Sequence, residues 1–376
     1  MPNVKVKESA YSRCFFMGLF RDGVVRRVVR YILLLLIGVV LCFLSGCQEQ
    51  ALEHQPRTVM ETPEDFADYV RNEPAVRDVK VWDNPYGPGL VIETKHYRVH
   101  TTLLEPLMLR QVPSFLESAY IAYQNQLPSP LSSIYLFDIY LFGTRNEWEA
   151  FTRSFVGEEA AIYLSIKEGA YTANGVWAGY NIGRKTTFQI LGHEGWHQFN
   201  QRLFVYRLPS WLDEGIATLF ETCRYTEGRF VFEPGKNLNR LGSLKLTMQN
   251  GSFIPLHRLI LLNPGQVLND GSGNDAAVIA YYAQVYAFVR FLREQDYGVR
   301  LRKYHALLLG AANGTWPLQE DWAAMASDRT RRLTAGWNSR VSGALFDYYV
   351  DENIQRLDAE YRAFCAKITY RIQLKQ

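Results

Sequence analysis

The chain has 376 residues, of which 48% are hydrophobic, and its 41 Lys and Arg against 38 Asp and Glu leave a formal net charge of +3. This length and hydrophobic content allow one large domain or two closely packed ones. Residues 1–46 hold seven basic and two acidic side chains, so the rest of the chain carries a net charge of about −2. With no basic cluster left, a nucleic-acid-binding protein is not expected.

The first 47 residues have the pattern of a secretory signal. Basic side chains, among them Arg21 and Arg30, precede an apolar run from Tyr31 to Leu44, and small residues follow. The apolar run is shorter than the ~20 residues that cross a bilayer, which makes a retained membrane helix the weaker alternative. The ending Leu-Ser-Gly-Cys47 resembles the lipobox of bacterial lipoproteins, whose cysteine is lipidated after cleavage.

We therefore expect residues 1–46 to be a lipoprotein signal peptide, Cys47 to carry the lipid that anchors the protein to a membrane, and residues 47–61 to form a polar tether. Translation could also begin at Met17, which would leave a shorter signal. Gln48 differs from the aspartate that retains many lipoproteins at the inner membrane. An outer-membrane anchor on the periplasmic face is the expected location.

From residue 62 to residue 182 the pattern alternates between helices and strands. Thr62-Pro63 and the capping box Thr144-x-x-Glu147 each begin a helix, the second ending near residue 155, and another helix ends near residue 126. Strands are expected at 79–82, 90–101, 134–142, 161–166 and 170–182.

After residue 221 the pattern is mainly helical. Helices are expected at 241–248, 255–262, 276–293 and 343–372, the last as one long amphipathic helix that closes the domain. The segment 263–275 is rich in Gly, Asn and Asp, which is typical of a loop that could border a cleft.

One stretch, Leu191-Gly-His-Glu-Gly-Trp-His-Gln-Phe199, carries the strongest chemical signal in the chain. Positions four apart lie on the same face of a helix, so His193 and His197 can bind one metal ion. Glu194 can then reach the open side of that ion and accept a proton from a bound water. Thr186-Thr-Phe-Gln189 reads as a capping box that opens this helix. The alternative is a pair of ordinary histidines on a helix.

A second helix start follows closely, with Ser210 as the expected N-cap and Asp213 as a first-turn carboxylate. Glu214 lies near the same turn and can swing toward the preceding helix. Two histidines and one glutamate leave the fourth zinc position open, as a catalytic site requires. The sequence therefore predicts a Zn2+ ion held by His193, His197 and Glu214.

These two segments resemble the gluzincin zinc metallopeptidases, whose third ligand is the Glu of a W-L-x-E-G-x-A segment, here Trp211 to Ala217. The interval between the second His and this Glu is two residues shorter than in zinc aminopeptidases and is closer to the peptidase-MA-like group, a domain-of-unknown-function type with many bacterial lipoproteins. The likeness covers roughly residues 93–300. It implies an α+β fold of zincin type, a mixed β-sheet packed on helices, with a catalytic region at 62–300 and a mainly helical C-terminal part at 301–376.

The resemblance also implies a tyrosine that hydrogen-bonds the oxyanion of the tetrahedral intermediate. Tyr282 matches the family spacing to Leu292, although Val285 replaces the family's glycine. Tyr281 and Tyr286 are alternatives, and all three could instead be core tyrosines of an ordinary helix.

Other polar residues near the motif have weaker assignments. Thr218 or Glu221 could orient a ligand histidine through its second ring nitrogen, although Glu221 could equally be a solvated residue near the helix end. Asp213 is expected to serve only the start of its own helix.

Aminopeptidases of this clan carry a glutamate for the substrate's free amine ahead of the zinc helix. Residues 173–181 contain no acidic side chain, which favours an endopeptidase, and an edge strand there could pair with a peptide substrate. The five histidines outside the motif, at 54, 96, 100, 257 and 305, are expected to be ordinary residues. Cys223 and Cys365 could form a disulfide or remain thiols.

The favoured hypothesis is a lipid-anchored zinc metallopeptidase, a hydrolase that cleaves peptides or proteins in the cell envelope with Glu194 as general base. A non-catalytic binding or scaffolding lipoprotein with a zincin fold is the alternative from another functional class. A zinc enzyme that hydrolyses another amide or ester, including cell-wall peptides, is the third.

Overall fold

The computed structural model describes residues 60–166, 169–268, 275–329 and 334–374. The expected signal peptide, the lipidated cysteine and most of the tether lie outside the described residues. The described part belongs to the structural unit that begins at Met60. None of its helices combines the length and the hydrophobicity that a bilayer crossing needs.

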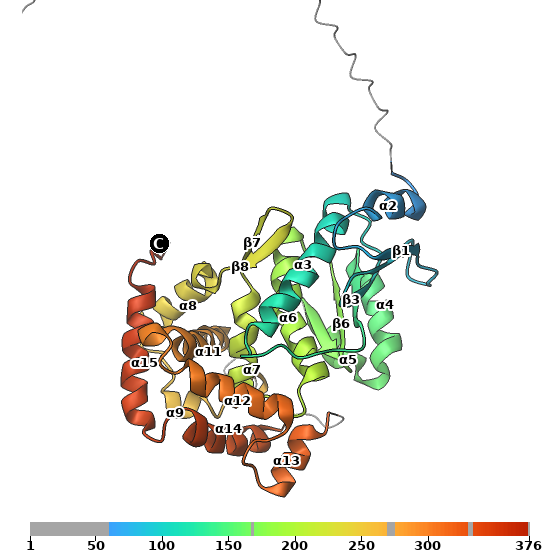
Figure 1. The fold of residues 1–376 in the computed structure, drawn as a ribbon. Helices are drawn as coiled ribbons and strands as arrows, with labels where there is room; N and C mark the ends of the chain where they lie inside the picture. The colour runs from blue at the N-terminus through green and yellow to red at the C-terminus, as the bar shows by residue number, and fades with distance from the viewer. Residues whose placement is uncertain (1–59, 167–168, 269–274, 330–333, 375–376) are drawn as a thin grey trace, which may run out of the picture. The chain divides into compact units, whose positions relative to one another are not determined.

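A six-stranded mixed sheet forms the first half of this unit (Figure 1). The strand order is β1-β2-β3-β4-β6-β5, in which β4 is parallel to both of its neighbours and the other adjacent pairs are antiparallel. The strands are β1 (Asp78–Val81), β2 (Leu90–Glu93), β3 (Tyr97–Thr101), β4 (Phe137–Phe142), β5 (Ala170–Ala173) and β6 (Val176–Tyr180). Among the described strands β5 pairs with β6 alone, so no described strand occupies its outer edge.

Helices cover both faces of the sheet. Buried and half-buried residues alternate along β3, and along most of β4, because successive side chains of a strand point to opposite faces. On one face, Trp148 and Phe151 of α4 (Arg145–Val156) pack in a cluster with Phe142. On the other face, α3 (Pro106–Gln124) and α6 (Arg184–Leu203) contact the sheet.

The second half of the unit is mainly helical and is organised around one central helix. Helix α11 contacts α7, α8, α12 and α15, and every residue from Ala283 to Leu292 is buried. Besides α3, α4 and α6, the α-helices are α2 (Pro63–Val70), α5 (Ala160–Leu164), α7 (Ser210–Ala217), α8 (Leu238–Gln249), α9 (Leu256–Leu259), α10 (Pro264–Leu268), α11 (Asp275–Glu294), α12 (Leu301–Asn313), α13 (Glu320–Ser327), α14 (Ala335–Tyr349) and α15 (Ile354–Thr369).

The expected fold class is confirmed, since a mixed sheet packs on helices and helices dominate the C-terminal part. The two helix starts predicted ahead of the motif are also confirmed. Thr62 caps α2 and Thr144 caps α4, each in a reciprocal capping box.

Several predicted element boundaries are wrong. The strand expected at 161–166 is the helix α5. The segments 90–101 and 170–182 each fold into two strands, and the second of them turns at Asn174 and Gly175, which both have positive φ. The single helix expected at 343–372 is two helices, because Asn353 caps a new one by accepting a hydrogen bond from the backbone of Arg356.

The expected helical half also contains a short hairpin that the sequence pattern does not predict. Strands β7 (Cys223–Thr226) and β8 (Arg229–Phe232) pair with each other through a turn at Glu227 and Gly228, again with positive φ at both. Phe230 of this hairpin packs on Phe115 of α3, so tertiary contact stabilises strands that are too short to show a pattern.

Substitution of Gly215 tests how tightly α7 packs on α11. An added Cβ would lie 2.5 Å from Val289 Cγ2 and 2.7 Å from the carbonyl oxygen of Val285. We expect Gly215→Ala to lower the free energy of unfolding by about 1–3 kcal/mol, because backbone atoms cannot move aside. Gly343→Ala on α14 is the matched control, since an added Cβ there meets nothing within 4 Å. Equal unfolding midpoints for the two variants would contradict this packing.

Candidate metal centre

Helix α6 carries the histidine motif and starts earlier than expected. Its N-cap is Gly183, at φ 90°, without a side-chain cap, so the predicted capping box from Thr186 is wrong. Thr187 instead accepts a hydrogen bond from the backbone of Ile182. At its middle, α6 is held against α3 by Tyr123, whose hydroxyl donates to the carbonyl oxygen of Gly192 at 2.8 Å.

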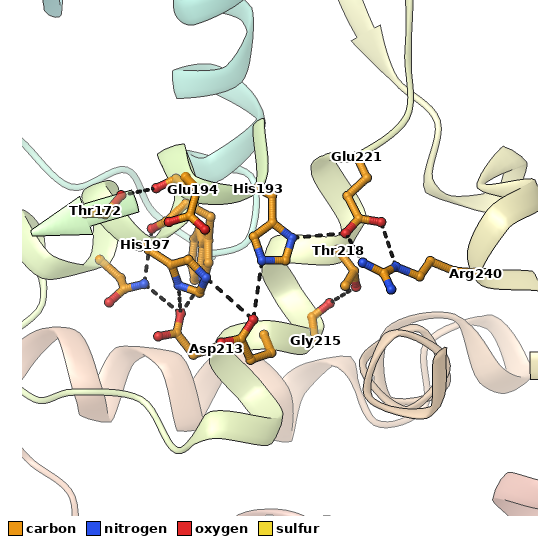
Figure 2. Close-up of polar contacts among 12 residues, drawn as sticks. Thr172, His193, Glu194, His197, Asp213, Gly215, Thr218, Glu221 and Arg240 are labelled. Carbon is orange, nitrogen blue, oxygen red and sulfur yellow. Dashed lines mark hydrogen bonds and ion pairs between the residues drawn. The ribbon is translucent and has the colours of Figure 1, made fainter. Parts of the chain in front are cut away.

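Both motif imidazoles are anchored by carboxylates through the ring nitrogen Nδ1. His193 Nδ1 lies 3.0 Å from Glu221 Oε1, and His197 Nδ1 lies 2.9 Å from Asp213 Oδ1 (Figure 2). A carboxylate at Nδ1 fixes the proton there and leaves the Nε2 lone pair free to bind a metal. Both Nε2 atoms face the third residue of the predicted set, Glu214.

Glu214 completes a group whose spacing matches a zinc site. Its Oε2 lies 3.3 Å from His193 Nε2 and 3.7 Å from His197 Nε2, and the three ligand atoms are all within 4.8 Å of one another. Zinc–ligand bonds of about 2.0–2.1 Å in a tetrahedron place neighbouring ligand atoms about 3.4 Å apart. Glu214 Oε2 is also buried without a hydrogen-bond partner among the described residues. A buried carboxylate oxygen of this kind is suited to bind a cation.

Asp213 has a larger role than the sequence analysis assigns to it. Its Oδ1 accepts hydrogen bonds from His197 Nδ1, from Trp196 Nε1 at 3.0 Å and from Asn200 Nδ2 at 2.8 Å. The expectation that Asp213 serves only its own helix is therefore wrong. The expected N-cap is also wrong by one residue, because Pro209 is the N-cap and Ser210 is the first residue of α7.

Of the two predicted orienting residues, Glu221 contacts a histidine and Thr218 does not. The Thr218 hydroxyl donates to the carbonyl oxygen of Gly215. The Glu221 side chain is only 3% exposed and also accepts two hydrogen bonds from the Arg240 guanidinium, at 2.6 and 2.8 Å. Burial alone would raise the pKa of Glu221, but the bonds from His193 and Arg240 outweigh it and lower this pKa to about 2.

Of the three candidate tyrosines, Tyr282 lies beside the imidazoles. Its ring centroid is 6.3 Å from that of His193, and the Arg240 guanidinium lies 5.1 Å from the Tyr282 ring centroid. The hydroxyl of Tyr281 contacts the carbonyl oxygen of Leu262, and that of Tyr286 donates to Pro234. Burial, followed by the negative charge of Glu214, raises the pKa of Tyr282, so its hydroxyl stays protonated as a donor.

Glu194 is held by its backbone while its carboxylate is free. The Thr172 hydroxyl of β5 donates to the Glu194 carbonyl oxygen at 2.8 Å. Within the described part of the chain, no side chain hydrogen-bonds the Glu194 carboxylate. Burial raises the pKa of Glu194 more than the nearby imidazoles lower it. A carboxylate with a raised pKa is suited to proton transfer near neutral pH.

The other histidines and cysteines have separate environments. His96 Nδ1 lies 2.7 Å from Glu117, and the His100 ring stacks on Tyr140. Cys223 and Cys365 are both free thiols. Over the ranges that the structure describes, His193, His197 and Glu214 form the single group of three or more metal-binding side chains with converging atoms.

Comparisons of the chain with protein-family models, curated proteins and solved structures found no match. The arguments for a metal centre therefore come from the residues and their geometry.

Zinc binding should release protons, because the raised pKa values favour a second proton, on Nε2, in each imidazole of the metal-free site. Burial lowers the pKa of both imidazoles. Contacts with Glu214 and Glu221 outweigh it for His193 and raise that pKa to about 9, and Asp213 and Glu214 outweigh it for His197 and raise that pKa well above its usual value. A metal ion binds only the neutral ring. At about pH 7.5 we expect zinc to displace roughly one proton from each imidazole, and zinc affinity to increase with pH up to about 9. Calorimetric titration in buffers with different ionisation enthalpies measures this release.

The anchoring carboxylates supply the control for that titration. Asp213→Asn and Glu221→Gln remove the charges that hold the protons, so fewer protons should be released. Zinc affinity should also fall by about 10–100-fold, since the rings lose their orienting partners. A binding heat that does not depend on the buffer in the unsubstituted protein would show that the imidazoles are already neutral and would contradict the electrostatic description.

Proposed function

We propose that the protein is a zinc-dependent metallopeptidase, with His193, His197 and Glu214 as the metal ligands. The convergence of these three ligand atoms, with both Nδ1 atoms anchored by carboxylates, is the observation that carries the proposal. Two nitrogens and one oxygen suit zinc, and three protein ligands leave a fourth position for chemistry. When bound there, zinc would supply Lewis acidity toward water and a carbonyl oxygen.

The chain's own residues have separable tasks in peptide hydrolysis. Glu194 would accept the proton of the attacking water and later pass it to the leaving amine. Tyr282 would donate a hydrogen bond to the oxyanion that develops on the substrate carbonyl. Asp213 and Glu221 would act through the two imidazoles, by holding each ring in the orientation that binds the metal.

The free edge of β5 supports a peptide as the substrate class. This edge strand is tied to the motif helix at Glu194 through Thr172. An extended peptide can add to an unpaired strand edge by backbone hydrogen bonds. Residues 173–181, at the end of β5 and along β6, include no carboxylate to bind a free amine, which favours cleavage within a chain. The N-terminal pattern supports a lipid-anchored protein in the cell envelope, facing the periplasm.

Substitution of Glu194 separates catalysis from metal binding. Glu194→Gln should keep stoichiometric zinc, measured by elemental analysis, and lose about 100–10,000-fold in kcat for hydrolysis of a peptide library, because the proton acceptor is gone. Glu214→Gln is the matched control and should lose zinc as well as activity. Full hydrolysis by Glu194→Gln would disprove the mechanism. Stoichiometric zinc without hydrolysis in the unsubstituted protein would favour the binding-protein alternative.

Substitution of the tyrosine pair tests the oxyanion donor. Tyr282→Phe should reduce kcat by about 100-fold or more with little change in KM, since the hydrogen bond forms only as charge develops. Tyr281→Phe alters the adjacent residue, whose hydroxyl contacts a backbone carbonyl 3.5 Å away. It should leave kcat close to that of the unsubstituted protein. Equal kcat values for both variants would remove Tyr282 from the reaction.

A further inference from the structure

A cavity adjoins the candidate metal centre. Its volume is about 890 Å³, and Thr172 and Asp213 belong to its wall. Thr172 hydrogen-bonds the backbone of Glu194, and Asp213 hydrogen-bonds the ring of His197. Both wall residues are therefore in direct contact with residues of the centre.

The same cavity is lined by two arginines, Arg207 and Arg329, that make no close ion pair among the described residues. In the described part of the chain, no carboxylate lies within ion-pairing distance of the Arg207 or Arg329 guanidinium. Arg207 donates to the carbonyl oxygen of Asp328, and Arg329 donates to that of Phe204 at 2.9 Å. Arg207 Nε is buried and has no hydrogen-bond partner among the described residues. Two half-buried cations are thus held only by backbone carbonyls.

The charges of the two arginines are offset only at longer range, that of Arg207 by Asp328 and that of Arg329 by Asp213. Burial lowers the pKa of Arg207, and burial together with the charge of Arg207 lowers the pKa of Arg329 to about 10. The Asp213 carboxylate that faces the cavity already accepts three hydrogen bonds at Oδ1.

Two further charged groups line the cavity. Arg202 lies 3.6 Å from Asp138, which offsets its charge, and Glu159 contributes a carboxylate to the same cavity. With Arg202 beside Asp138, the lining arginines that make no ion pair with a described carboxylate are Arg207 and Arg329.

We propose that this cavity, the Arg207–Arg329 pocket, binds a carboxylate group of the peptide substrate. The inference rests on the proposed metallopeptidase function and adds a specificity to it. Guanidinium groups bind carboxylates through paired, charge-assisted hydrogen bonds, and a substrate carboxylate would give both arginines the close ion pair that no carboxylate of the described residues makes. The cavity also meets the end of β5, at Thr172 to Gly175. A peptide paired with β5 beside Glu194 would therefore extend into it.

Two sources of that carboxylate are possible, an acidic side chain and the free C-terminus of the peptide. Blocked peptides separate them. Acetyl-Ala-Ala-Asp-Ala-Ala-amide and its Asn analogue differ only in a side-chain carboxylate, whereas acetyl-penta-alanine as free acid and as amide differ only at the terminus. Calorimetry on the zinc-loaded full chain carrying Glu194→Gln measures binding without turnover.

One charged peptide should bind at least about ten-fold more tightly than its neutral analogue, since each charge-assisted hydrogen bond contributes on that scale. Arg207→Gln and Arg329→Gln should remove this preference, and Arg329→Lys should keep part of it. Arg71→Gln is the control, because this exposed arginine pairs with Asp68 on α2. The peptide pair that shows the preference identifies the source.

Equal affinities within both peptide pairs would overturn the proposal. This result needs no arginine variant, so it does not depend on whether the variants fold. A charge preference that survives both Gln substitutions would overturn it as well. Zinc content and hydrolysis of an unfolded protein by the unsubstituted chain are measured in parallel. Failure of the metallopeptidase proposal would appear there, and failure of the carboxylate pocket would appear only in the peptide affinities.

Discussion

The contacts between two imidazoles and two carboxylates are the interaction on which the candidate centre depends. Histidines four apart on a helix share a face, but their rings can rotate. Glu221 and Asp213 remove that freedom by accepting from the Nδ1 atoms of His193 and His197. Both carboxylates come from the segment after α6, and Glu214 lies between them in sequence. The nine residues from Asp213 to Glu221 therefore supply the third ligand and both orienting groups.

Close packing of α6 and its neighbours makes these contacts possible. A Cβ at Gly192 would lie 2.3 Å from the carbonyl oxygen of Phe220, so the residue before the first histidine must be small for the Glu221 segment to approach. Asn200 adds a polar link from the end of α6 to Asp213. The buried helix α11 contacts α7, the helix that carries Glu214, and brings Tyr282 to the same place. Residues of the helical core thus position most of the side chains of the centre.

The ligand set could be predicted from sequence because it follows local rules. His193 and His197 obey helical spacing, and Glu214 lies on the next helix after a short connection. The role of Asp213 could not be predicted in this way, because its distance from His197 depends on how α6 crosses α7. Arg240 was missed for the same reason. It meets Glu221 across 19 residues that include the β7–β8 hairpin, which itself depends on contact with α3. Arg207 and Arg329 are more than a hundred positions apart. No periodic pattern in the sequence could predict that two residues at this separation line the same cavity.

The most direct test of the metal centre is zinc K-edge X-ray absorption on the zinc-loaded protein. We expect four nitrogen or oxygen neighbours at about 2.0–2.1 Å, with outer-shell scattering from two imidazoles, which corresponds to His193, His197, Glu214 and one water. The Glu214→Gln variant should lose this spectrum. A sulfur neighbour at about 2.3 Å, which would point to Cys223 or Cys365, or scattering from fewer than two imidazoles, would contradict the assigned centre.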